Sequence, residues 1–205
     1  MARPSQTKEN LIKAATDLIW ENSYGATSVD DICARAEVRK GSFYHFFESK
    51  AHLAIATIDA AWAVMLPVLN EIFSPLTPPL ERFERHAALM LQCQEKRLAE
   101  TGHVCGCPLA TLGSEVGTQD ELIRAKVAEI FDHHLCFYES AISDAARAGL
   151  IDGSDAAFKA KTLQAYMQGA CTQARVLNDL SPVRNLARAM LSFLGAGSKS
   201  TPVGT

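Results

Sequence analysis

Two cysteines separated by one residue, Cys105 and Cys107, are the side chains in this sequence with the most reactive chemistry. Cys107 precedes Pro108, and because proline suits the first position of a helix, we expect Cys107 at or just before the N-cap. The positive end of a helix dipole lowers the pKa of a thiol beside it. Cys105 and Cys107 are therefore a candidate sensor, in which one thiol attacks and another resolves. A disulfide across one residue is strained, so we expect the resolving thiol elsewhere in the chain. The alternative is a structural cysteine that packs at a helix start.

The same region contains residue types that bind zinc, and we considered a metal site built from them. They are His103, Cys105, Cys107, His133, His134 and Cys136. Their spacings match no standard zinc site. His133 and His134 are adjacent, so on a helix they point about 100° apart. The sequence therefore predicts no metal.

A second group of polar side chains lies in residues 39–45. Arg39 and Lys40 can bind phosphates or guanine edges, although a solvated surface pair is the alternative. Gly41 and Ser42 leave room for close approach, and Tyr44 and His45 present polar tips. Three aromatic residues have the spacing to pack this segment on its neighbours: Phe43, Phe46 and Phe47. The segment is a candidate for reading DNA.

Apolar residues recur at helical spacing along the whole chain, and no alternating strand pattern is present. A first helix precedes Tyr24. Ser28 and Asp31 form a capping box for a short second helix, and a third covers about 40–47. Ser49 then caps a long helix toward Phe73. Two short helices joined by a tight turn and braced by a first helix match a helix-turn-helix.

Beyond a proline-rich linker at 74–79, the pattern predicts helices over about 80–99, 108–117, 121–148, 155–177 and 181–194. Thr118 and Ser154 are expected to cap two of them. The predicted fold is all-α with about nine helices. A helix-turn-helix domain spans 1–50, a helical bundle for ligand binding and dimerisation spans 51–195, and 196–205 form a disordered tail.

The segment from Thr27 to Leu53 resembles the signature of the TetR/AcrR family of transcriptional regulators. Its frame is Thr27-Ser28, Asp31-Ile32, Ala36, Val38, Gly41-Ser42-Phe43-Tyr44, Phe47 and Ser49-Lys50. The resemblance implies phosphate contacts from Thr27, Tyr44 and Lys50, and contacts near bases from Lys40, Ser42 and His45. The expected DNA-binding set is Thr27, Ser28, Arg39, Lys40, Ser42, Tyr44, His45 and Lys50.

Three residues depart from the family pattern. Glu37 stands where glycine is frequent, and a left-handed turn there costs about 1 kcal/mol. Arg39 stands where a serine or threonine cap is common, and Cys33 replaces an alanine. These departures put the base preference in doubt and leave the fold prediction unchanged.

The stretch from Gly106 to Leu112 also resembles TetR-type proteins, in which it begins the helix linking the DNA-binding domain to the ligand pocket. The family implies a pocket in the C-terminal bundle. Large side chains that can line it, or form ordinary core, are Trp62, Met65, Met90, Phe131, Phe137, Tyr138, Tyr166 and Met167. The last two long helices resemble the family's dimer interface, and small residues suit close contact there or within one chain: Ala165, Gly169, Ala170, Ala174, Ala187 and Ala189.

Composition narrows the class of protein. The chain has 205 residues, 48% hydrophobic and 21% charged, with a net charge of −3. Residues 1–50 carry seven basic and seven acidic side chains, so the usual basic signal of a DNA-binding domain is absent. The apolar run 51–69 contains His52 and Asp59 and is read as a buried helix, so no membrane contact is expected. Without an export signal, the six cysteines are expected to be reduced, in the cytoplasm.

The sequence therefore predicts a homodimeric repressor that binds double-stranded DNA at a palindromic operator and is released by a small molecule or an electrophile. No cofactor fingerprint or nucleophile–base motif is present, so we expect neither a cofactor nor an enzyme. One alternative is a thiol oxidoreductase that uses Cys105 and Cys107. The other is a helical adaptor with a degenerate DNA domain, which the neutral N-terminal charge favours.

Overall fold

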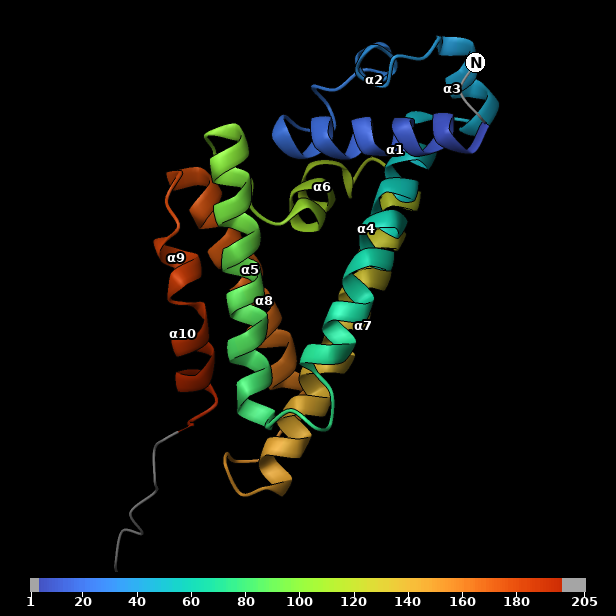
Figure 1. The fold of residues 1–205 in the computed structure, drawn as a ribbon. Coiled ribbons are helices and arrows are strands. Elements are labelled where there is room, and N and C mark those ends of the chain that lie inside the picture. Colours follow the sequence, from blue (N-terminus) through green and yellow to red (C-terminus); the bar gives the residue numbers. More distant parts are fainter. Residues whose placement is uncertain (1–3, 197–205) are drawn as a thin grey trace, which may run out of the picture.

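The computed structural model describes residues 4–196, and every regular element within that range is an α-helix. Figure 1 shows three N-terminal helices at one end of a longer helical bundle. The prediction of an all-α fold with a helix-turn-helix followed by a bundle is confirmed. The described part contains ten helices where about nine were predicted.

The N-terminal group consists of α1 (Pro4–Glu21), α2 (Val29–Arg35) and α3 (Lys40–Phe46). The predicted capping box begins α2. The Ser28 hydroxyl accepts a hydrogen bond from the Asp31 backbone N–H at 3.1 Å, and the Asp31 carboxylate accepts one from the Ser28 N–H at 2.9 Å. Both otherwise unpaired donors at the start of the helix are thereby satisfied.

The middle of the chain forms α4 (Lys50–Ile72), α5 (Pro79–Thr101), α6 (Pro108–Val116) and α7 (Glu121–Arg147). Ser49 caps α4 as predicted, because its hydroxyl accepts a hydrogen bond from the His52 N–H. Among the described helices, α4 alone is long and apolar enough to cross a membrane by length and composition. In the structure it packs against α1 and α7, and it supplies buried residues to both large cores (Figure 1).

The C-terminal part contains α8 (Ala156–Leu177), α9 (Ser181–Arg184) and α10 (Leu186–Phe193). A single helix over 181–194 was predicted, and the structure divides it at Asn185. The Asn185 side-chain amide donates to the Ser181 carbonyl at 2.9 Å. The Asn185 backbone N–H also donates to the Ser181 carbonyl, at 3.2 Å, and the division at Asn185 gives the tenth helix.

Two predicted helix caps are wrong by one or two residues. Asp120, not Thr118, caps α7, and Asp155, not Ser154, caps α8. In both cases the aspartate carboxylate accepts the N–H three residues ahead, at 3.0 Å and 3.1 Å. The Ser154 hydroxyl instead donates to Asp152. Aspartate also adds its negative charge at the positive end of the helix dipole.

Two large hydrophobic cores run along the molecule, and a smaller third cluster lies around Val104, Cys171 and Leu180. The first joins α1–α4 to α6 and α7, with Leu11, Phe43 and Ile130 almost fully buried. The second joins α4, α5, α7, α8 and α10. The first core contains residues on both sides of Lys50, where α4 begins. The structure therefore shows no separation there, and the domain boundary at 50/51 stays a prediction. The predicted tail lies outside the described residues except for Ala196, whose N–H bonds to the Leu191 carbonyl.

Candidate nucleic-acid interface and internal cavity

The turn between α2 and α3 is held in a left-handed backbone conformation at Glu37. Its φ is 56°, so the chain tolerates at this glutamate the conformation that glycine adopts most easily. The next residue closes the turn, since the Val38 N–H donates to the Cys33 carbonyl at 3.0 Å. Cys33, which stands in place of an alanine, is buried beside Ile32 in the first core. The departure at Glu37 therefore leaves the helix-turn-helix geometry intact.

The third helix has one buried face and one exposed face. Phe43 and Phe47 are buried, with ring centroids 5.9 Å apart, and they anchor α3 on α1 and α2. Lys40, Tyr44 and His45 are exposed on the outer side, and Tyr44 is 56% accessible. An amphipathic helix with polar and aromatic tips outward has the form of a helix that enters the major groove.

The exposed basic side chains at the start of α3 differ in their partners. Arg39 is the N-cap residue, but its side chain makes no capping hydrogen bond. Lys40 Nζ lies 2.8 Å and 3.0 Å from the two carboxylate oxygens of Asp30 on α2. The hydrogen bond to Asp30 and its negative charge raise the pKa of Lys40. To contact DNA, Lys40 therefore has to leave or share its ion pair with Asp30.

The structure holds Thr27 and Lys50 against the protein itself. Thr27 is buried, and its hydroxyl donates to the Ser23 carbonyl at 2.7 Å, so a phosphate contact by Thr27 stays a prediction and requires this bond to be exchanged. Lys50 Nζ donates to the carbonyls of Tyr24 and Thr27 at 2.9 Å and 3.0 Å and lies over the Tyr24 ring. Partial burial lowers the pKa of Lys50. A phosphate contact by Lys50 stays a prediction and requires these bonds to be exchanged.

The two predicted serines occupy intermediate positions. Ser28 is exposed, but its hydroxyl is engaged in the capping box with Asp31. Ser42 is half-buried on α3. The neighbouring Gly41 is exposed, and a Cβ there would meet no atom within 4 Å. The backbone at Gly41 is therefore open to a partner, in agreement with the room for close approach that the sequence suggested.

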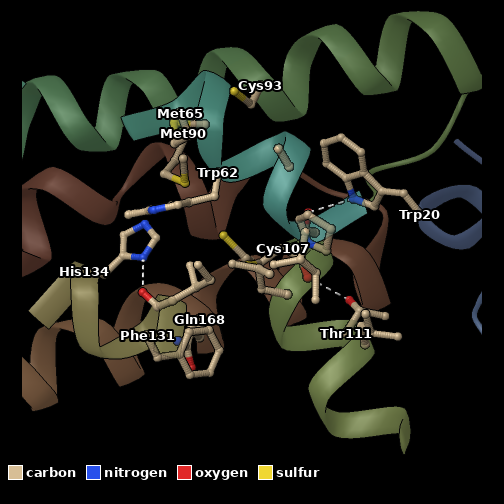
Figure 2. Close-up of a pocket in the computed structure, with 18 of the residues that line it drawn as sticks. Trp20, Trp62, Met65, Met90, Cys93, Cys107, Thr111, Phe131, His134 and Gln168 are labelled. Carbon is tan, nitrogen blue, oxygen red and sulfur yellow. Dashed lines mark hydrogen bonds between the residues drawn. The ribbon is translucent and has the colours of Figure 1, made fainter. Parts of the chain in front are cut away.

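An internal cavity of about 240 Å³ lies among α1, α4, α5, α6, α7 and α8 (Figure 2). Five of the eight predicted residues line it: Trp62, Met65, Met90, Phe131 and Met167. Aromatic, aliphatic and sulfur-containing side chains make most of the wall. A mostly apolar cavity with few polar groups is typical of a small-molecule site.

The other three predicted residues do not line this cavity. Tyr138 is fully buried one helical turn past His134, and its hydroxyl contacts His86 Nδ1 at 3.0 Å and Met167 Sδ at 3.3 Å. Phe137 packs on the second core. Tyr166 is 42% exposed on the outer side of α8. Adjacent helical residues point about 100° apart, so Met167 faces the cavity while Tyr166 faces away from it.

The two sensor candidates lie in different environments. Cys107 is the N-cap residue of α6 and lines the cavity, whereas Cys105 is buried outside it, with Sγ 3.7 Å from the His103 carbonyl. Burial raises the pKa of the Cys107 thiol, and the N–H groups of Ala110 and Leu109 offset this only in part. The predicted lowering of the thiol pKa by the helix N-terminus is therefore wrong, because loss of hydration outweighs it. No cysteine of the described residues is paired in a disulfide.

Hydrogen bonds join the cavity wall to the N-terminal helices at both ends of α6. The Gly106 carbonyl accepts from Trp20 Nε1 and from Gln94 Nε2, each at 3.1 Å. At the other end, the Glu115 carboxylate accepts from the N–H groups of Tyr24 and Gly25 at 3.0 Å and 2.6 Å. A displacement of α6 therefore acts directly on α1 and on the turn before α2.

The zinc-ligand residue types do not converge. Within residues 4–196, no group of three or more histidine, cysteine or acidic side chains is placed to hold a metal ion. His133 and His134 instead lie against Trp62, with ring centroids 5.5 Å and 5.1 Å away.

Two family profiles match the chain. The profile of bacterial regulatory proteins of the tetR family matches residues 11–57, which contain the helix-turn-helix. The profile of the C-terminal domain of LmrA/YxaF-like transcriptional regulators matches residues 79–189. The chain belongs to the TetR family. As a TetR-family member it is a DNA-binding transcriptional regulator, and the helix-turn-helix and the cavity are parts of one regulatory protein.

Other TetR-family proteins resemble this chain over different lengths. The transcriptional regulator AcuR of Cereibacter sphaeroides is 31% identical over 129 residues, which are 62% of this chain and 57% of AcuR. The repressor DhaR of a Mycobacterium species is 24% identical over 185 residues, 89% of each protein. A regulatory protein TetR from Rhodobacter sphaeroides superposes with a TM-score of 0.78 at 26% identity, over 90% of this chain and 97% of that one. These relatives are regulators and not enzymes.

Sequence reasoning missed several cavity residues of this TetR-family regulator. On α8, Gln164, Gln168 and Cys171 line the cavity together with Met167. Their spacing of three and four residues marks one helix face, and that signal was available in the sequence. Trp20 and Glu115 also line it, but no local pattern connects them.

Proposed function

We propose that this protein is a repressor that binds a palindromic operator as a homodimer in the cytoplasm and is released when a small molecule occupies the internal cavity. The observation that supports this most is the bonding of α6. The Gly106–Cys107 wall of the cavity is hydrogen-bonded to Trp20 of α1, next to the helix-turn-helix. Ligand binding can shift the protein between two states only if the ligand binds them with different affinity.

In the DNA-bound state, the outer face of α3 lies in the major groove. Lys40, Tyr44 and His45 are the exposed side chains at that face, and Arg39 stands at its start. Lysine suits the acceptor edge of guanine, while Tyr44 suits a phosphate. The neutral charge of residues 1–50 means that affinity depends on the placement of these few cations.

The dimer uses the outer faces of α8 and α10. Large apolar side chains are exposed there, with Val176 78% and Leu177 64% accessible and Phe193 also exposed. Two helices from each protomer form a four-helix interface in this proposal. A two-fold dimer places its recognition helices about 34 Å apart, or a multiple of that, and so reads a palindrome.

A covalent effector at Cys107 is the second candidate for release. The thiol faces the cavity, which favours it, but burial keeps the pKa of that thiol high. The reaction then requires an electrophile that enters the cavity and meets a neutral thiol. Cys105 faces elsewhere and has no part in it.

Fluorescence anisotropy on DNA upstream of the gene, and on sequences selected from a random library, tests the DNA-binding part. We expect an affinity that falls steeply with salt, and a slope reduced by about one for Lys40→Gln. Arg85→Gln, which removes an exposed cation on α5, is the matched control and should change neither quantity. Salt-insensitive binding, or none to any DNA, would contradict the proposal and favour the adaptor alternative.

A further inference from the structure

The cavity contains no cation to pair with an anionic ligand. No lysine or arginine is among the described residues that line it. Its single carboxylate, that of Glu115, is engaged by the N–H groups of Tyr24 and Gly25. An unpaired charge in an apolar site carries a large desolvation cost. The cavity is therefore unsuited to an anionic ligand, and the carboxylate of Glu115, which could attract a cation, is already bonded to two backbone N–H groups.

The protonation of His134 follows from its geometry. Its Nδ1 lies 2.9 Å from the Ile130 carbonyl, which can only accept, so Nδ1 carries a proton. Burial lowers the pKa of His134, so the ring is neutral and its Nε2 carries a lone pair. No hydrogen bond within the described residues uses Nε2, and Figure 2 shows this second nitrogen turned toward Trp62. His134 thus offers the cavity a hydrogen-bond acceptor.

Other polar side chains of the wall donate a hydrogen bond to a backbone carbonyl and keep their oxygens free. These bonds run from Thr16 to Ile12, from Thr57 to Ala54, from Thr111 to Cys107 and from Gln164 to Phe131. Each hydroxyl or amide oxygen retains lone pairs that can accept a hydrogen bond. The wall therefore offers several free acceptors to a ligand that donates a hydrogen bond.

Donors on the wall without a partner in the described residues include the indole N–H of Trp62 and the side-chain amide of Gln168. A hydroxyl group suits both needs, because it donates one hydrogen bond and accepts others. It can donate to His134 Nε2 and accept from Trp62 or Gln168. A carbonyl oxygen or an ether could only accept.

The volume limits the size of the ligand. A cavity of about 150 Å³ lined by aliphatic and aromatic side chains takes up benzene. This cavity, at about 240 Å³, is about half as large again. Trp62, Phe131 and Met90 supply flat or adaptable apolar surface. The space suits a molecule of two fused rings.

We infer that the cavity binds an uncharged, two-ring hydroxylated molecule of the phenol or alcohol class, oriented by its hydroxyl group on His134 Nε2. This inference deepens the proposed function, since it names the class of effector for the same site. Ligand binding is measured without DNA, so its outcome is independent of whether the protein binds an operator.

The test titrates the full chain at neutral pH with three fluorescent probes of one shape: 2-naphthol, 2-methoxynaphthalene and 2-naphthoate. They carry a donor hydroxyl, an acceptor-only ether and an anionic carboxylate. We expect 2-naphthol to bind about 2- to 10-fold tighter than the ether, the range of one net hydrogen bond. We expect 2-naphthoate to bind about 30-fold or more weaker than 2-naphthol.

Two neighbouring histidines provide the matched variants. His134→Phe should abolish the preference for 2-naphthol over 2-methoxynaphthalene while leaving the affinity for the ether nearly unchanged. His133→Phe alters an exposed ring that also stacks on Trp62 but does not line the cavity, and should keep the preference. Thermal unfolding of both variants verifies that they fold.

Each other result overturns the inference. Equal binding of 2-naphthoate shows that the cavity accepts a negative charge. A preference that survives His134→Phe shows that the hydroxyl is recognised elsewhere. Failure of all three probes to bind shows that the cavity is not a site for this class of molecule, and intact DNA binding in the same preparation would leave the repressor proposal standing.

Discussion

The indole N–H of Trp20 donates a hydrogen bond to the Gly106 carbonyl at 3.1 Å, across 86 positions of sequence. Trp20 belongs to α1, which braces the helix-turn-helix, and Gly106 precedes Cys107 in the cavity wall. Arg97 lies over the same indole ring at 4.1 Å and contacts Asp17 of α1. This bond connects the backbone next to Cys107 directly to α1.

Trp20→Phe should weaken the coupling between the cavity and the operator. The variant keeps an aromatic ring but loses the donor, so one net hydrogen bond, about 0.5–1.5 kcal/mol, disappears from the connection. We measure the dissociation constant of 2-naphthol with and without saturating operator. The ratio of the two constants should move about 2- to 10-fold toward one. An unchanged ratio would mean that the signal travels through Glu115 or α4 instead.

Cys107 should react slowly with electrophiles at neutral pH. Burial raises the pKa of its thiol, so the thiolate fraction is small and grows about tenfold for each unit of pH, without levelling off near neutrality. Mass spectrometry of the Cys107 peptide after timed exposure to N-ethylmaleimide measures this rate. The exposed Cys136 in the same sample is the control that shows the reagent to be active. A plateau of the Cys107 rate below pH 8 would contradict the raised pKa.

Asp30→Asn should increase affinity for DNA of arbitrary sequence by about 2- to 5-fold, because Asp30 holds Lys40 at 2.8 Å and repels phosphates. The gain is expected to stay within that range because exposed ion pairs are weak and are screened by salt. Anisotropy titrations at several salt concentrations should also give a steeper salt dependence. Glu84→Gln, the same charge change on an exposed acid of α5, serves as control. In the double variant Asp30→Asn with Lys40→Gln, the gain in DNA affinity should disappear, because it acts through Lys40. A gain of the same size in the double variant would refute this explanation.

Gly106→Ala should destabilise the protein by about 1–3 kcal/mol. Its φ of 70° strains any residue with a Cβ, and that Cβ would lie 3.1 Å from the Cys171 carbonyl oxygen. Gly41→Ala is the contrasting variant, because it lies within α3 with nothing within 4 Å, and should stabilise by about 0.5–1 kcal/mol. Urea unfolding compares both with the parent chain. Equal free energies of unfolding for the two variants would contradict the prediction, because they would show that the backbone at position 106 adjusts to a Cβ without cost.

Much of the helix-turn-helix was predictable from residues close together in sequence. Ser28 and Asp31 cap one helix, Ser49 caps another, and Phe43 and Phe47 share a buried face. Each of these relations spans one helical turn, so the local backbone geometry determines it. The same reasoning failed where two candidate caps stood side by side, because the choice between Ser154 and Asp155 depends on the approach of the preceding loop.

The sequence by itself determined the all-helical pattern, the helix-turn-helix and the helix that starts at Pro108. Only the tertiary structure decided that Trp20 meets Gly106, that Thr27 and Lys50 turn inward, and that Met167 and not Tyr166 faces the cavity. It also reversed the expected pKa shift of Cys107. The reason is physical: helix formation follows spacing along the chain, whereas hydration, and the partner of each side chain, depend on residues brought together by packing from distant helices.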